Sequence, residues 1–377
     1  MNLNRMRSTW VMVLLLAVLT PTMALACAPA APPSTTVPSS TTSTTSSTTA
    51  STTSTTSTTS TTSTTTSTTT TTTTVPELTA WVFTLKVGMT PALVTKYGGP
   101  AAARAKVDQQ LATVNAVYGT QFARPIRWVV QEFYTYTQPA ANERFVPHPN
   151  ANFLLLYSEN TVEDDGGYLP FTYSVVIRWL PTAPYNGVFG PYAADSLIHE
   201  LGHARGGLDL YNLGVDGANN PINGQAFTAP GGFMSLIYSQ TEFDAYTKNI
   251  VNAGRASLYN DDHIVKQSLP PTYRVKATRN GVNIAGATVA LYPSSWGSRS
   301  VSSTPLLTGT TDANGVWQLP RDPFNPNLAY TALEYPLFLA KVTQGAYTGY
   351  AWLSFTDAGN AYFANPTAAY QLNVAIS

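Results

Sequence analysis

Hydrophobic and polar residues follow four successive patterns along the chain. A short apolar run, Trp10 to Leu19, comes first, and residues 34–74 then contain almost only Ser and Thr. Strand and helix patterns alternate in the next section, and after Leu269 short strand patterns are separated by turns. The patterns divide the chain into a leader (1–26), a Ser/Thr-rich linker (27–75), a first folded domain (76–268) and a second one (269–377).

The leader has the features of a secretory signal peptide. Arg5 and Arg7 precede the apolar run, which is about half of the roughly 20 residues that a membrane-spanning helix needs. The run is followed by Ala24-Leu25-Ala26-Cys27, which resembles a bacterial lipobox with Ala24 in place of the usual Leu, and the same residues also fit an ordinary Ala-x-Ala cleavage site. The first interpretation predicts a membrane tether through lipidated Cys27, and the second a freely secreted protein. Cys27 is the only cysteine, so we expect no disulfide within the chain.

The Ser/Thr-rich linker cannot bury apolar area, and we therefore expect a disordered stalk. A flexible coil of this length would extend on the order of 35 Å on average. Such a stalk could hold a folded domain away from a cell envelope.

The first folded domain reads as a small twisted sheet with helices. Strand-like runs are found at 81–87, 126–133, 153–157 and 173–180. An Ala-rich helix begins near Pro100 and places Leu111, Val114 and Tyr118 at helical spacing. A second helix is expected from Gly190-Pro191 to about Arg205, and a third after Ser239, where Ser239-Gln240-Thr241-Glu242 reads as a capping box. We expect an α+β fold.

The second folded domain is predicted to be all-β, with about seven strands and no helical periodicity. Asn280-Gly281 is a strong hairpin signal, and the strand count is typical of an immunoglobulin-like sandwich. The segments Gly286–Tyr292 and Thr311–Trp317 resemble carboxypeptidase-regulatory-like and Cna-B-like surface modules.

Charge excludes two classes of partner. Charged residues make up 11% of the chain and balance to a net charge of zero, so neither nucleic acid nor an anionic membrane is an expected target. Hydrophobic residues at 44%, with 21 Tyr, are sufficient for a sizeable core.

The predicted helix before Arg205 carries the clearest candidate chemistry. His199 and His203 are one turn apart, so both imidazoles can bind one Zn²⁺, and Glu200 beside them can act as a general base. A catalytic zinc needs a third protein ligand. Gly206 can end the helix and turn the chain back, which would bring Asp209 to the metal.

The pattern HExxHxxGxxD, from His199 to Asp209, resembles the metzincin signature with Asp as third ligand, most closely the snapalysin-type variant. Gly231-Gly232-Phe233-Met234-Ser235 resembles the metzincin Met-turn, and the helix after Ser239 its closing helix. The resemblance covers about 81–256. It implies a secreted zinc metalloendopeptidase, acting on protein or peptide, whose extended substrate pairs with an edge strand containing Val175–Trp179. Many metzincins have Tyr two residues after the Met, whereas this chain has Leu236 there and Tyr238 later, which makes Tyr238 a candidate transition-state stabiliser.

Several alternatives remain open at this point. The segment His199–Leu208 also resembles the immunoglobulin-A-protease family of zinc peptidases, in which an Asp falls one place further on. Competing third ligands are His148, His263, Asp216 and Glu242, and Glu242 would imply a gluzincin. A different class of function is a cell-surface adhesin or carbohydrate-binding protein with a structural or degenerate metal site. In either case we expect a monomer.

Overall fold

The structure is a computed structural model that describes residues 79–160, 162–164, 166–183, 185–235, 240–255, 268–324, 333 and 335–377. The described residues all belong to one compact unit. The predicted leader and linker lie outside the described residues. The described part is a mixed α and β fold with three sheets, as expected for an α+β section followed by a β section. The domain boundary at 268/269 stays a prediction.

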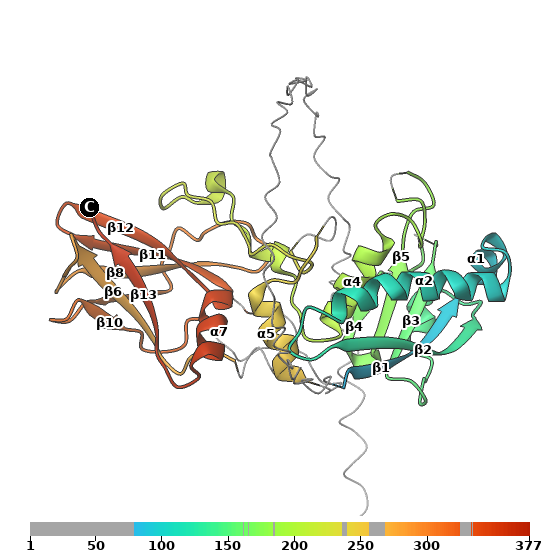
Figure 1. The fold of residues 1–377 in the computed structure, drawn as a ribbon. Helices are drawn as coiled ribbons and strands as arrows, with labels where there is room; N and C mark the ends of the chain where they lie inside the picture. Colours follow the sequence, from blue (N-terminus) through green and yellow to red (C-terminus); the bar gives the residue numbers. More distant parts are fainter. Residues whose placement is uncertain are drawn as a thin grey trace, which may run out of the picture. The chain divides into compact units, whose positions relative to one another are not determined.

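The first sheet has five strands in the order β2-β1-β3-β5-β4 (Figure 1). Neighbouring pairs among β2, β1, β3 and β5 are parallel, and β4 joins β5 antiparallel at the edge. The four parallel strands are those that the sequence predicts. The short strand β4 was not predicted. The bounds are β1 Trp81–Met89, β2 Ile126–Thr135, β3 Phe153–Ser158, β4 Gly167–Leu169 and β5 Ser174–Arg178.

Both faces of this sheet are covered, and strand β3 shows how. Phe153, Leu155 and Tyr157 point into the main core, whereas Leu154 and Leu156 point into a smaller cluster on the opposite face. The main core includes the buried hydrophobic residues of helices α2 (Pro100–Tyr118) and α4 (Ala193–His203), which lie across the sheet in Figure 1. The smaller cluster is completed by Tyr136 and by the short helix α3 (Ala140–Glu143).

The predicted helix at Pro100 forms for the expected reasons. Pro100 occupies the first helical position, where its missing N–H costs nothing, and Leu111, Val114 and Tyr118 are buried on one face. Tyr118 also donates a hydrogen bond from its hydroxyl to the Ile198 carbonyl of α4, at 2.9 Å. The short helix α1 (Pro91–Lys96), capped by Thr90, precedes it.

The helix predicted after Ser239 forms, but it does not begin at the predicted capping box Ser239–Glu242, whose Ser239 lies outside the described residues. Helix α5 spans Ala245–Gly254, and its N-cap is Asp244, whose carboxylate accepts from the Thr247 N–H at 2.9 Å. Glu242 lies ahead of the helix and pairs with Lys248 at 2.9 Å. Asp satisfies the free N–H groups of a first turn as well as Ser does, so local sequence offered two caps.

The described residues from 268 to 377 form two four-stranded sheets. One has the order β10-β6-β13 with β7 paired to β6, and the other has the order β12-β11-β8-β9. Strands β6 and β7 meet at the predicted Asn280-Gly281 turn, where both residues have positive φ. The bounds are β6 Tyr273–Arg279, β7 Val282–Asn283, β8 Thr288–Ser294, β9 Leu307–Thr310, β10 Val316–Gln318, β11 Leu337–Gln344, β12 Tyr347–Ser354 and β13 Tyr370–Ala375.

The expectation that this section has no helix is wrong. Helix α7 (Phe355–Ala364) connects β12 to β13, and Ser354 caps it by accepting from the Asp357 N–H at 3.1 Å. The Ser354-x-x-Asp357 pattern is a start signal that the sequence carries. Among the described residues, no helix has the length and apolar character that crossing a membrane requires.

Candidate metal centre

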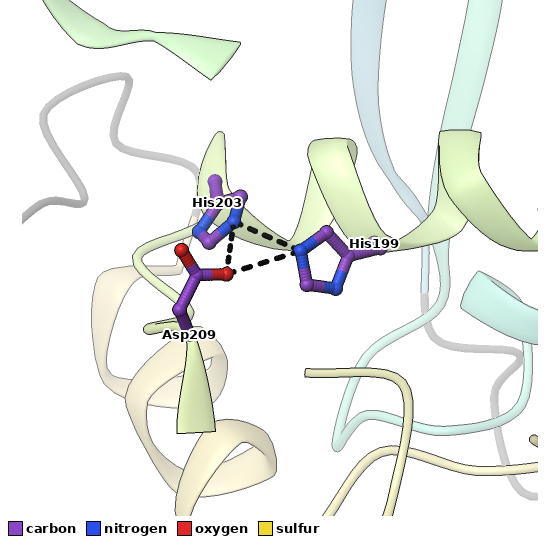
Figure 2. A group of neighbouring side chains, drawn as sticks. All are labelled: His199, His203 and Asp209. Atoms are coloured by element: carbon purple, nitrogen blue, oxygen red, sulfur yellow. Dashed lines mark hydrogen bonds and ion pairs between the residues drawn. The ribbon is translucent and has the colours of Figure 1, made fainter. Parts of the chain in front are cut away.

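Three side-chain atoms converge at the C-terminal end of α4. His199 Nε2 lies 3.1 Å from His203 Nε2, and Asp209 Oδ1 lies 3.1 Å from the first and 3.0 Å from the second (Figure 2). The two histidines share a helix face because they are four residues apart, as the sequence predicts. The structure therefore brings together the three residues that the motif singles out.

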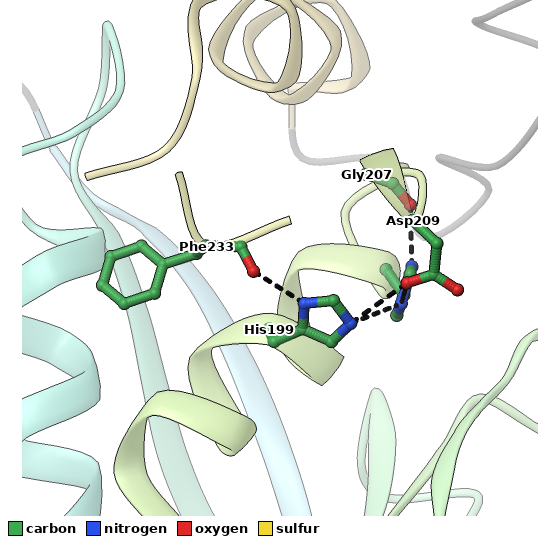
Figure 3. Close-up of polar contacts among 5 residues, drawn as sticks. His199, Gly207, Asp209 and Phe233 are labelled. Carbon is green, nitrogen blue, oxygen red and sulfur yellow. Dashed lines mark hydrogen bonds and ion pairs between the residues drawn. The ribbon is translucent and has the colours of Figure 1, made fainter. Parts of the chain in front are cut away.

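The backbone fixes which nitrogen of each imidazole carries a proton. His199 Nδ1 lies 2.7 Å from the Phe233 carbonyl oxygen (Figure 3), and His203 Nδ1 lies 2.9 Å from the Gly207 carbonyl oxygen. A carbonyl only accepts hydrogen bonds, so each Nδ1 must donate. In the neutral imidazoles both Nε2 atoms then present lone pairs to one another and to a carboxylate oxygen. Three acceptors at this spacing repel one another unless they share a cation.

The donor set fits zinc. Histidine nitrogen and carboxylate oxygen bind Zn²⁺ at about 2.0–2.2 Å, and three such atoms around one ion must lie within about 4 Å of each other. The three atoms are 3.0–3.1 Å apart. Backbone acceptors on both Nδ1 atoms are the outer contacts that orient metal-binding histidines. Within the described residues, this is the one group of three His, Cys, Asp or Glu side chains placed to hold a metal.

A glycine turn delivers Asp209 to the two histidines. Gly206 has φ +90°, a conformation that side chains disfavour, and the Gly207 N–H returns to the Gly202 carbonyl at 2.9 Å. Asp209 then stands at the start of the 3₁₀ turn η2 (Leu210–Leu213). The helix ends and the chain reverses as the sequence predicts.

Met234 packs against this turn, since a Cβ at Gly207 would lie 3.0 Å from its Cε. Its side chain is fully buried, and a Cβ at Gly202 would lie 2.5 Å from its sulfur, so a side chain at position 202 would force Met234 to shift. The Met234 carbonyl also accepts from the Leu210 N–H at 2.8 Å. The segment Phe233–Met234 thus contacts His199 on one side and the residue after Asp209 on the other.

Charge in the cluster favours an imidazolium–carboxylate arrangement. Burial lowers the pKa of His203, but the Asp209 carboxylate more than offsets this and raises the pKa to about 9. Burial likewise acts to raise the pKa of Asp209, and the two imidazoles more than compensate, so that its pKa lies well below the usual range. In the metal-free cluster, His203 is therefore protonated at neutral pH.

Glu200 is buried beside the cluster, with 4% of its surface exposed. Burial raises the pKa of its carboxyl, while the neighbouring His199 and His203 act in the opposite direction. Its Oε2 has no hydrogen-bond partner in the described protein, whereas the carboxylate accepts a backbone hydrogen bond from Tyr168 on β4. A buried carboxylate with one free oxygen is suited to take up a proton.

Two neighbours of Glu200 were missed by the sequence reasoning. Tyr168 lies on the unpredicted strand β4, and a Cβ at Gly167, which has φ +119°, would be in ordinary van der Waals contact with Glu200 Oε2, at 3.8 Å. The pair Gly166-Gly167 is the one signal in the sequence that marks this approach, since an isolated glycine pair next to a strand often indicates close contact.

The other candidate third ligands do not join the cluster. His148 contacts the carbonyl oxygens of Ala151 and Thr172, Asp216 pairs with Arg299, and Glu242 pairs with Lys248. His263 and the candidate stabiliser Tyr238 lie outside the described residues.

The predicted edge strand is wrong. Strand β5, which contains Val175–Arg178, is bonded to β3 on one side and to β4 on the other. The edge of this sheet next to α4 is β4 instead. Because β4 is only three residues long, its alternation is too short to be recognised in the sequence.

Comparisons with known proteins give little. No model of a known family matches the chain, and no curated protein matches it. Among solved structures, one described as "Structure of a chaperone-substrate complex" is 11% identical, with a TM-score of 0.32, over 48% of this chain and 35% of that chain. The match spans about a third of that chain's length, and a likeness this weak carries no argument about function.

Proposed function

We propose that the protein is a zinc-dependent endopeptidase of the metzincin type, secreted or held at the cell surface, which hydrolyses peptide bonds in protein or peptide substrates. The observation that carries the proposal is the convergence of His199 Nε2, His203 Nε2 and Asp209 Oδ1 next to the buried carboxylate of Glu200. A structural zinc site is typically closed by four protein ligands. Three ligands with a free carboxylate oxygen beside them are typical of a catalytic site.

His199, His203 and Asp209 would hold the ion. Zn²⁺ bound there supplies Lewis acidity, which polarises a carbonyl and makes water a stronger acid. Glu200 would take a proton from the attacking water at Oε2 and pass it to the amine that leaves. The raised pKa of Glu200 assists both transfers, since a carboxylate of higher pKa accepts a proton more readily and still returns it.

The strand arrangement supports the same proposal. The resemblance to metzincins implies a small sheet whose strands precede the zinc helix, and the five strands of the first sheet precede the helix that carries both histidines. An extended substrate would add to the edge strand β4, where Tyr168 contacts Glu200, and would so be held close to the base.

Replacement of the base tests the activity. Glu200→Gln keeps the size of the side chain and removes its capacity to accept a proton, so casein cleavage by the zinc-loaded protein should fall on the order of 10²- to 10⁴-fold. Zinc content should stay at that of the wild type. Glu242→Gln is the matched control, because Glu242 is an exposed carboxylate away from the cluster, and it should leave cleavage unchanged. Full activity of Glu200→Gln would refute the proposed role.

A further inference from the structure

The segment that follows Asp209 is hydrogen-bonded to a loop of the C-terminal sheets. Residues 295–301, between β8 and β9, run beside residues 212–219 and form backbone hydrogen bonds at three positions. The Gly297 N–H donates to the Asn212 carbonyl at 3.0 Å. We call residues 295–301 the bracing loop and residues 210–220 the ligand segment.

The two further backbone bonds extend the contact along the ligand segment. The Asp216 N–H donates to the Arg299 carbonyl at 3.1 Å, and the Val301 N–H donates to the Asn219 carbonyl at 3.0 Å. Arg299 also forms a bidentate ion pair with the Asp216 carboxylate, in which Nε donates to Oδ2 at 3.0 Å and Nη2 donates to Oδ1 at 2.5 Å. The side chains of this ion pair are about half exposed. We therefore expect the three backbone hydrogen bonds to stabilise the contact between the two segments more than the ion pair does.

The bracing loop is itself firmly supported. It continues directly from β8, which lies inside its sheet between β11 and β9. Ser298 folds the loop on itself by donating to the Ser295 carbonyl, and the Ser302 N–H donates to the Pro293 carbonyl of β8. Val301 is buried, with 4% of its surface exposed.

The connection from the bracing loop to the metal cluster is short. Asn212, which accepts from Gly297, donates its own N–H to the Asp209 carbonyl at 3.0 Å. Asp209 is therefore connected to two neighbouring segments. The next residue, Leu210, is hydrogen-bonded to Met234, and Asn212 links the Asp209 carbonyl to the bracing loop.

We infer that the bracing loop positions Asp209 for metal binding, so that the C-terminal sheets form part of the metal centre. The inference rests on the metal site of the proposed function. Arg299 is a positioning residue in this arrangement, since it contacts the ligand segment and not the cluster. The linkage is reciprocal: if the loop favours the metal-binding position of Asp209, a bound metal must stabilise the loop.

Amide hydrogen exchange on the full chain, with zinc and with a chelator, tests the linkage. Zinc should slow amide exchange at Gly297 and Val301 at least about threefold. If the loop can open only after the zinc ion is released, and free zinc is present at 100 times its Kd, the slowing should approach about 100-fold. Amides of β6 and β13, in the other sheet, are the internal control and should change little. Bound zinc with unchanged exchange in the bracing loop would overturn the inference while leaving the proposed function intact. Absence of bound zinc would overturn both.

A variant pair tests the positioning role of Arg299. Arg299→Ala should weaken zinc binding about 1.5- to fivefold in a chelator competition, the range expected from loss of one exposed ion pair that acts through Asp209. Arg299→Lys should recover part of the affinity. Arg279→Ala, an arginine on β6 that stacks on Tyr347, should leave zinc affinity unchanged. Equal loss in Arg299→Ala and Arg279→Ala would show only general destabilisation and would contradict the role.

Discussion

At the scale of single residues, the central feature is a contact between groups that repel one another when neutral. Both Nδ1 atoms are committed to carbonyl oxygens, so both Nε2 lone pairs meet at 3.1 Å next to a carboxylate. A cation between these atoms removes the repulsion, and that cation can be either a proton or a metal ion. In the three-residue cluster alone the proton sits on His203, whose pKa is about 9.

Competition between this proton and the metal predicts a pH dependence of zinc affinity. The folded-state pKa of His203 lies above the usual 6.5, so the imidazolium stabilises the metal-free fold below pH 6.5, and this stabilisation is lost as the pH rises through 9. Zinc must displace the proton, so the affinity should rise about tenfold per pH unit between pH 7 and 9 and then level off. Calorimetry in buffers of different ionisation enthalpy should detect about one released proton at pH 7. An affinity independent of pH across this range would contradict the assignment.

At the scale of elements, sequence reasoning succeeds where a pattern is local and long enough to read. The parallel strands, helix α2 and the HExxH helix α4 all follow from periodicity over five residues or more. The turn at Gly206 follows from the freedom of glycine at positive φ.

The failures have an equally physical cause. Strand β4 is three residues long and forms because its backbone pairs with β5. Such pairing depends on the tertiary structure, so the local sequence does not reveal it. Helix α7 spans Phe355–Ala364, where aromatic residues that favour strands are packed into a helix by its neighbours: Phe355 lies 5.0 Å from Tyr246 of α5 between ring centroids. The start of α5 was misplaced because two caps compete in the sequence.

The cap of α5 can be tested by stability. Asp244→Ala removes the acceptor for the Thr247 N–H, which should lower the free energy of unfolding by about 1–2 kcal/mol in denaturant titration. Glu242→Ala removes only an exposed ion pair with Lys248 and should cost less than about 0.5 kcal/mol. If the Glu242 variant were the less stable of the two, the capping box would be right and the assigned cap wrong.

At the scale of the molecule, the described residues on either side of position 268 share one hydrophobic core. Ring contacts cross between them, as where Phe227 lies 5.3 Å from Trp352. At Gly359 of α7, a Cβ would lie 2.4 Å from the Tyr246 ring, so the close approach of α5 and α7 depends on glycine. Such contacts join residues more than 100 positions apart, and local periodicity does not reveal them. The sequence indicates Pro270-Pro271 as a boundary and contains no sign of the bracing loop.

Anomalous diffraction at the zinc edge, from crystals of the full chain grown with zinc, tests the proposed metal centre most directly. We predict one strong peak per chain, about 2.1 Å from His199 Nε2, His203 Nε2 and an Asp209 carboxylate oxygen, with Glu200 close by but not bound to it. A peak elsewhere, coordination by Glu200 in place of Asp209, or no peak would contradict it.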